Sequence, residues 1–137
     1  MDVQINEYGS AILAFGVIGG LLLLQLLVAD VLGIVRGHTP GSSIENDHKS
    51  ILFRAARAHA NTNETIAAFI VLLLFSIVLS ADPKWINSLS IAYLIGRVGH
   101  MCCYYADQRK ARSVFFGISF VALLGLFLVG WGKWLVT

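Results

Sequence analysis

Four long apolar segments occupy most of this 137-residue chain and limit what it can fold into. Their approximate bounds are 8–35, 65–81, 86–103 and 114–136. A helix needs roughly 20 apolar residues to cross a bilayer, and each segment is near or above that length once the polar turns before the second are included. We therefore predict an all-α integral membrane four-helix bundle, formed as a single domain over residues 1–137.

The composition excludes several other classes of protein. With 57% hydrophobic residues, 13% charged residues and a mean hydropathy of +0.75, the chain has no separate soluble domain. A formal charge of +2 is too small to predict nucleic-acid binding. The two cysteines, Cys102 and Cys103, are adjacent and poorly placed for a mutual disulfide. Without a second cysteine pair, we predict no metal site.

The links between the segments predict how the helices are connected. The first link, residues 36–50, is rich in glycine, proline and serine and predicts a long loop. Asp82 followed by Pro83 is typical of a helix N-terminus, so we expect a short turn that makes helices two and three antiparallel neighbours. The third link, residues 107–113, is short and basic.

The distribution of cations predicts the orientation in the membrane. Seven lysines and arginines lie in or near the first and third links, whereas the opposite side has only Lys84 and Lys133. The positive-inside bias places these two links in the cytoplasm and both termini outside. Trp85, Trp131 and Trp134 fall near the outer boundary, where indoles prefer to lie.

Two polar stripes interrupt the apolar pattern of helices two and three. The first contains residues three or four apart, namely Arg54, Arg57, Asn61 and Glu64. The second has the same spacing and contains Ser90, Tyr93, Arg97, His100, Tyr104 and Asp107. Since a lone polar stripe would cost several kcal/mol to bury in lipid, we expect the two stripes to face each other. His59 falls on a different face of its helix, together with Asn63.

The stripes also indicate a type of ligand. Arginine side chains cluster at the predicted cytoplasmic ends, at positions 36, 54, 57, 97, 109 and 112. Guanidinium groups bind carboxylates bidentately, Glu64 suits an ammonium group and Asn61 suits a peptide amide. A small peptide with two carboxylates and one amine fits this set, and glutathione is the abundant cellular example.

Three sequence strings extend this interpretation to a family. They are R-A-A-R-A-H-A-N-T-N-E-T from Arg54, G-R-V-G-H-M-C-C-Y-Y from Gly96, and A-R-S from Ala111. Together they resemble the MAPEG superfamily, membrane-associated proteins of eicosanoid and glutathione metabolism, and especially its branch of microsomal glutathione transferase and microsomal prostaglandin E synthase. The resemblance implies a homotrimer of four-helix subunits that binds glutathione between neighbouring subunits near the cytoplasmic side.

The matching positions imply a set of site residues. Residues implied to bind glutathione are Arg36, Arg57, His59, Asn61, Glu64, Arg97, His100 and Tyr104. Arg112 matches an arginine beside the thiol, and Ser113 matches the serine next to it. The implied activity is that of a membrane-bound glutathione transferase, which forms the thiolate and conjugates it to lipophilic electrophiles from the bilayer. Reduction of lipid hydroperoxides is a second reaction open to the same thiolate.

Several alternatives stay open at this stage. Ala60, Thr65 and Phe116 depart from positions that hold arginine or tyrosine in eicosanoid-synthesising members, which favours a general transferase. Tyr104 competes with Arg112 as the partner of the thiol. A lipid-binding scaffold without enzymatic activity and a small transporter are the alternative functions. Arg109, Lys110 and Arg112 are also typical of a basic membrane anchor without chemistry.

Overall fold

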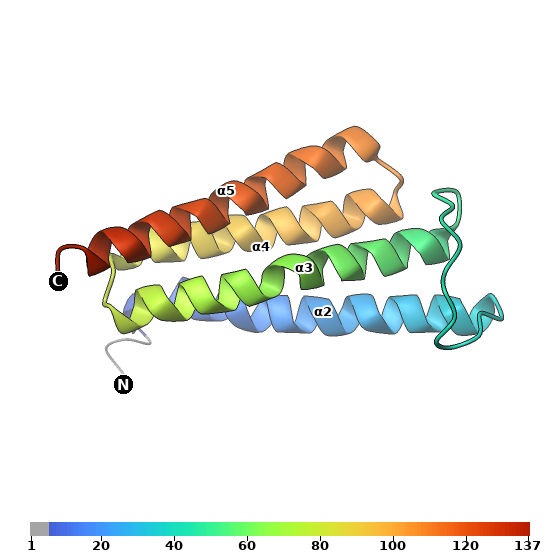
Figure 1. Ribbon diagram of the computed structural model, residues 1–137, viewed down its shortest axis with the longest axis horizontal. Helices are drawn as coiled ribbons and strands as arrows, with labels where there is room; N and C mark the ends of the chain where they lie inside the picture. Colours follow the sequence, from blue (N-terminus) through green and yellow to red (C-terminus); the bar gives the residue numbers. More distant parts are fainter. Residues whose placement is uncertain (1–5) are drawn as a thin grey trace.

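The computed structural model describes residues 6–137 and confirms an all-α four-helix bundle. The helices of that range are α2 (Gly9–Val35), α3 (Ile51–Val78), α4 (Pro83–Tyr105) and α5 (Arg109–Trp134). They lie side by side along one long axis, and successive helices run in opposite directions (Figure 1). Helices α3 and α4 contact each other, with α2 packed on both and α5 also packed on both.

The helix starts follow from local sequence. Ser50 caps α3, because its hydroxyl accepts a hydrogen bond from the backbone N–H of Phe53 at 3.4 Å. Asp82 caps α4 by accepting from the N–H of Lys84 at 2.9 Å, and Pro83 occupies the first helical position. Residues 79–82 are therefore a short turn between antiparallel helices, which confirms the prediction for this link. Residues 36–50 form the predicted loop between α2 and α3.

The third link is shorter than we predicted. Helix α5 begins at Arg109, so only residues 106–108 separate it from α4, and the prediction of a link over residues 107–113 was wrong. Asp107 has a φ of 53°, which turns the chain sharply at this point. The basic residues of the link therefore lie in the first turns of α5. Cations are unfavourable at a helix N-terminus, so the basic character of this turn requires another explanation.

Membrane-spanning character is clear for three of the four helices. Within residues 6–137, α2, α3 and α5 are long and apolar enough to cross a bilayer, whereas α4 does not meet that standard. Helix α4 carries the predicted polar stripe, and five of its six members are buried inside the bundle: Ser90, Tyr93, Arg97, His100 and Tyr104. The sixth, Asp107, lies exposed beyond the helix end. The low hydropathy of α4 thus reflects side chains that face protein.

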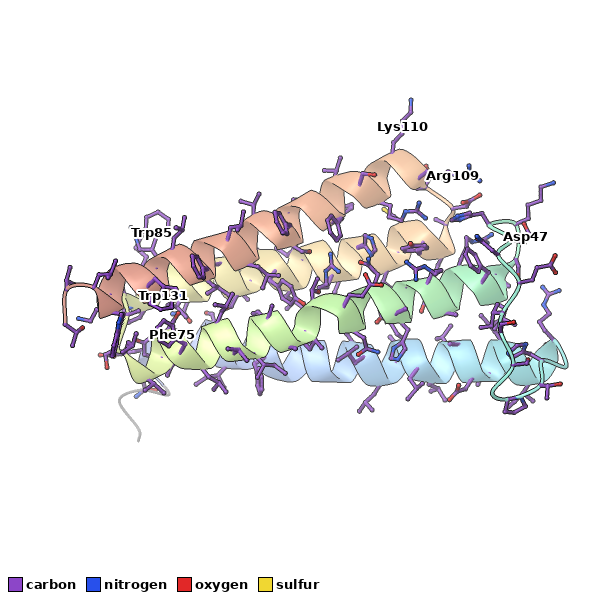
Figure 2. All side chains as sticks on the ribbon, viewed as in Figure 1. Asp47, Phe75, Trp85, Arg109, Lys110 and Trp131 are labelled. Carbon is purple, nitrogen blue, oxygen red and sulfur yellow. The ribbon has the colours of Figure 1, made fainter. Side chains whose placement is uncertain are left out.

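The two ends of the bundle differ in chemistry. Asp47, Arg109 and Lys110 lie at the end that carries the α2–α3 loop, and Trp85 and Trp131 lie at the other end (Figure 2). The start of α2 and the C-terminus share this second end (Figure 1). Tyr8 ties the start of α2 to the α3–α4 turn, because its hydroxyl donates to the carbonyl of Ala81. The geometry matches the predicted distribution of cations and indoles, while the orientation across the membrane stays a prediction.

Helices α4 and α5 approach closely at Gly96. A Cβ atom built on Gly96 would lie 2.1 Å from Ser119 Oγ, 2.9 Å from the Ser119 backbone nitrogen and 3.0 Å from the Phe115 carbonyl oxygen. Backbone atoms cannot rotate away as a side chain can. The close contact between these helices therefore depends on the absence of a side chain at position 96.

We expect Gly96→Ala to destabilise the protein by about 1–3 kcal/mol, because the added methyl group forces α4 and α5 apart. Thermal unfolding in detergent measures the effect. Gly117→Ala is the matched control, since a Cβ there meets nothing within 4 Å. That control should be neutral or stabilising by roughly 0.5–1 kcal/mol through helix propensity. Equal melting temperatures for the two variants would contradict the close-contact explanation.

Candidate functional site

A fully buried arginine, Arg97, lies at the centre of the site. It projects from α4, and its side chain reaches both α3 and α5. Its Nε donates to Ser119 Oγ at 2.9 Å, and its Nη1 donates to Asn61 at 3.0 Å (Oδ1) and 3.4 Å (backbone O). The contact between Arg97 and Asn61 joins the two polar stripes and confirms that they face each other.

The polar contacts continue along α3 toward solvent. Asn61 Nδ2 donates to Glu64 Oε2 at 3.2 Å, and Glu64 Oε1 lies 3.9 Å from Arg57 Nη2. The side chains of Arg57 and Glu64 are 43% and 55% exposed, so this pair lies at the edge of the bundle. Contacts between neighbouring side chains thus lead from the surface to the core. We call this series the polar line, and its members are Arg57, Glu64, Asn61 and Arg97.

In the described part of the chain, no carboxylate forms a direct ion pair with Arg97, and Glu64 acts on its charge only from beyond Asn61. The two ion pairs found among residues 6–137 join Arg57 to Glu64 and Arg109 to Asp107, so neither involves Arg97. In addition, Arg97 Nη2 is buried and has no hydrogen-bond partner within the described residues. A buried cation without a counterion is costly, and an unpaired buried donor adds to that cost. An anionic group that reached Nη2 would relieve both.

A second cluster lies further along α4 and on α5. The guanidinium carbon Cζ of Arg112 lies 4.3 Å from the centre of the Tyr104 ring, which is a cation–π contact. The His100 ring stands edge-on to Tyr104 at 5.0 Å and lies 6.1 Å from the Phe116 ring. Phe116 in turn lies 5.6 Å from Arg97 Cζ. Phe116 therefore connects the two clusters through aromatic contacts.

Three of the predicted site residues do not join these contacts within the single chain. Arg36 is exposed at the C-terminal end of α2 and makes no side-chain hydrogen bond or ion pair with residues 6–137. His59 lies 2.9 Å from Asn63 through Nε2, on the face expected for it. Ser113 is exposed, and its hydroxyl donates only to the carbonyl of Arg109 at 3.5 Å. The roles of Arg36 and His59 in binding glutathione, and the catalytic role of Ser113 beside the thiol, stay predictions.

Arg54, which belongs to the first stripe, has a structural contact instead. Its Nη1 donates to the carbonyls of His48 and Lys49 at 2.7 and 3.0 Å, and its Nη2 donates to the carbonyl of Tyr105 at 3.5 Å. These bonds fasten the end of the α2–α3 loop to the C-terminal end of α4. Arg54 therefore stabilises the loop rather than extending the line of polar contacts.

Sequence reasoning did not find Ser119. This serine is buried on α5, where it accepts the hydrogen bond from Arg97. It is the only polar residue in the apolar run from Val114 to Gly130, and that isolation was the available signal. No group of three or more histidine, cysteine, aspartate or glutamate side chains within residues 6–137 is arranged to bind a metal ion. The functional groups of the candidate site are guanidinium, amide, carboxylate, hydroxyl and imidazole groups.

Comparison with known proteins identifies a family for the chain. No curated protein matches the chain. The MAPEG family model matches residues 11–131, a range that begins in α2 and ends in α5 and so includes all of both clusters. Since the match covers most of the sequence, this integral membrane four-helix protein belongs to the MAPEG family.

Proposed function

We propose that the protein is a membrane-bound glutathione transferase. The observation that carries the proposal is Arg97, a fully buried cation without a carboxylate partner and with a free Nη2, in a chain of the MAPEG family. Family membership supports glutathione or eicosanoid metabolism in general. The unpaired guanidinium supports an anionic co-substrate, and glutathione has two carboxylates.

The polar line of α3 and α4 suits the rest of glutathione. Arg97 and Arg57 bind its carboxylates, Glu64 binds its ammonium group, and Asn61 binds a peptide amide. The Phe116 ring lies 5.6 Å from Arg97 Cζ and is 38% exposed, and we propose that a rotation of this ring would give a ligand access to Nη2. The His100 ring contacts both Tyr104 and Phe116, so His100 and Tyr104 lie next to the proposed path. Arg36 and His59 complete the proposed set of binding residues.

The second cluster, which contains Arg112 and Tyr104, promotes formation of the thiolate. A free thiol has a pKa of about 8.5 and is only a few per cent ionised at pH 7, so an adjacent positive charge increases its reactivity. Arg112 supplies that charge from its place over Tyr104. Ser113 turns its hydroxyl away from the carbonyl of Arg109, its 3.5 Å partner, and donates to the sulfur instead. The thiol proton leaves to solvent, and the sulfur attacks an electrophilic carbon of a lipophilic substrate. With a halogenated aromatic substrate, a carbon–sulfur bond forms and halide departs.

We also propose that the site is shared between subunits of a homotrimer. Arg57 and Glu64 are about half exposed at the edge of the single chain, although they belong to the line of polar contacts. A neighbouring subunit would cover them and enclose the ligand. The site then opens toward the cytoplasmic side, with both termini outside.

Calorimetric titration of the detergent-solubilised protein with glutathione tests binding, and conjugation to 1-chloro-2,4-dinitrobenzene tests catalysis. We expect a saturable binding heat that fits a fixed ratio of glutathione to protein chains. We also expect a conjugation rate above the background rate without protein. S-methylglutathione is the matched control ligand, since it should bind without reacting. Binding without any rate would instead indicate a scaffold. An absence of binding, with solute flux in liposomes, would indicate a transporter.

A further inference from the structure

Three of the five N–H groups of Arg97 donate hydrogen bonds within the described part of the subunit, and the other two have no partner there. A guanidinium side chain has five N–H bonds, one on Nε and two on each terminal nitrogen. The Nε hydrogen goes to Ser119 Oγ, and both Nη1 hydrogens go to Asn61. The two Nη2 hydrogens have no partner within residues 6–137. The intramolecular bonds thus occupy two of the three nitrogens and leave one for a ligand.

Ser119 is itself held in a single orientation. It is 1% exposed, and its hydroxyl donates to the carbonyl of Phe115 at 3.1 Å, one turn earlier in α5. With its proton committed there, the oxygen presents a lone pair to Arg97 Nε. The close approach of α5 to Gly96, the residue before Arg97, brings the hydroxyl within reach. The donor and one of the two acceptor sites of this buried hydroxyl are therefore used.

We propose that Ser119 is a positioning residue for glutathione binding. Together with Asn61 it fixes the plane of the Arg97 guanidinium, so that Nη2 is directed at an anionic group of the ligand. Asn61 alone holds only Nη1 and leaves the group free to rotate about that contact. Ser119 adds a second anchor from a different helix. This inference rests on the proposed function, because it assumes that glutathione is the ligand of Arg97.

Three variants at one position separate the hydrogen bond from packing. Ser119→Ala removes the acceptor, and Ser119→Cys keeps a similar volume but is a weak acceptor. Ser119→Thr retains the hydroxyl. We expect the dissociation constant for glutathione to rise about five- to tenfold in the Ala and Cys variants and to return toward wild type in the Thr variant. The kcat at saturating glutathione should change less than twofold, because Ser119 does not touch the reacting atoms.

Ser76→Ala is the matched control. Ser76 is also fully buried, and its hydroxyl donates to the carbonyl of Leu72 at 2.8 Å, but it has no contact with Arg97. Ser76→Ala should lose about as much stability in thermal unfolding as Ser119→Ala does. Its affinity for glutathione should not change. A second readout is the combination of Ser119→Ala with Arg97→Met. The loss in kcat/KM for glutathione should not be additive, since the serine acts through the arginine.

The outcomes distinguish a failure of the positioning role of Ser119 from a failure of the proposed function. If the wild type binds glutathione and Ser119→Ala binds it equally well, the positioning role is wrong while the proposed function stands. A fall in kcat with unchanged affinity would also overturn the role. If the wild type gives no glutathione binding, the proposed function fails and the positioning role fails with it.

Discussion

Arg97→Met is expected to weaken glutathione binding by about a hundredfold or more. The substitution removes the two free Nη2 donors, and hydrogen bonds to charged groups are worth about 1.5–3 kcal/mol each. Methionine also fills much of the same volume and is flexible enough to pack beside Tyr93 and Phe116, whose rings lie near the guanidinium at 5.8 and 5.6 Å. Calorimetric titration with glutathione measures the loss.

The thermal stability of Arg97→Met shows whether Arg97 is needed for ligand binding or for folding. Replacing a buried charge that lacks a counterion with an apolar residue of similar size is often neutral or stabilising. We therefore expect the ligand-free Arg97→Met protein to melt at or above the temperature of the wild type. Arg97→Lys is a second variant, which keeps the charge but cannot bridge Ser119 and Asn61. A large fall in melting temperature with intact glutathione affinity would assign Arg97 a structural role.

Much of the fold could be predicted from local patterns in the sequence. The length of the apolar segments predicted four helices, and Asp82 with Pro83 predicted the start of α4. The spacing of the α4 stripe predicted its buried face, because helical periodicity alone decides which side chains share a side. The start of α5 could not be predicted from the same reasoning. The three cations were assigned to the link, and Gln108 before Arg109 makes no side-chain capping hydrogen bond that would mark a helix start in the sequence.

The candidate site was predictable in part. Facing stripes followed from the cost of burying polar groups in lipid, and the contact between Arg97 and Asn61 agrees with that expectation. The register of α5 against α4 did not follow, because it depends on close packing at Gly96 that no periodicity encodes. Ser119 was missed for this reason. Arg36 and Ser113 are exposed on the surface of the subunit, so their predicted roles require a ligand or a neighbouring subunit.

Arg112→Ala is expected to reduce the conjugation rate at pH 7 by about ten- to thirtyfold at saturating glutathione. A positive charge beside the sulfur favours the thiolate and lowers the pKa of the bound thiol. Without Arg112 that pKa returns toward about 8.5, and only a few per cent of bound glutathione is ionised at pH 7. The deficit should shrink as the pH rises and nearly vanish by about pH 9.5, where the thiol ionises without help. The pH dependence of kcat, together with the ultraviolet absorbance of the bound thiolate, measures this.

Two matched variants decide between Arg112 and the other candidates. Lys110→Ala removes a cation from the same turn of α5 without touching the Tyr104 ring, so a membrane anchor would be affected equally while the thiolate would not. Tyr104→Phe keeps the ring under Arg112 and removes only the hydroxyl. We expect both to retain most of the activity and the wild-type pH profile. If Tyr104→Phe shows the pH-dependent loss and Arg112→Ala does not, the hydroxyl stabilises the thiolate. If Lys110→Ala and Arg112→Ala lose activity equally at every pH, the basic turn acts as a membrane anchor. Only a charge held beside the sulfur produces a loss of activity that disappears at a pH where the thiol is already ionised.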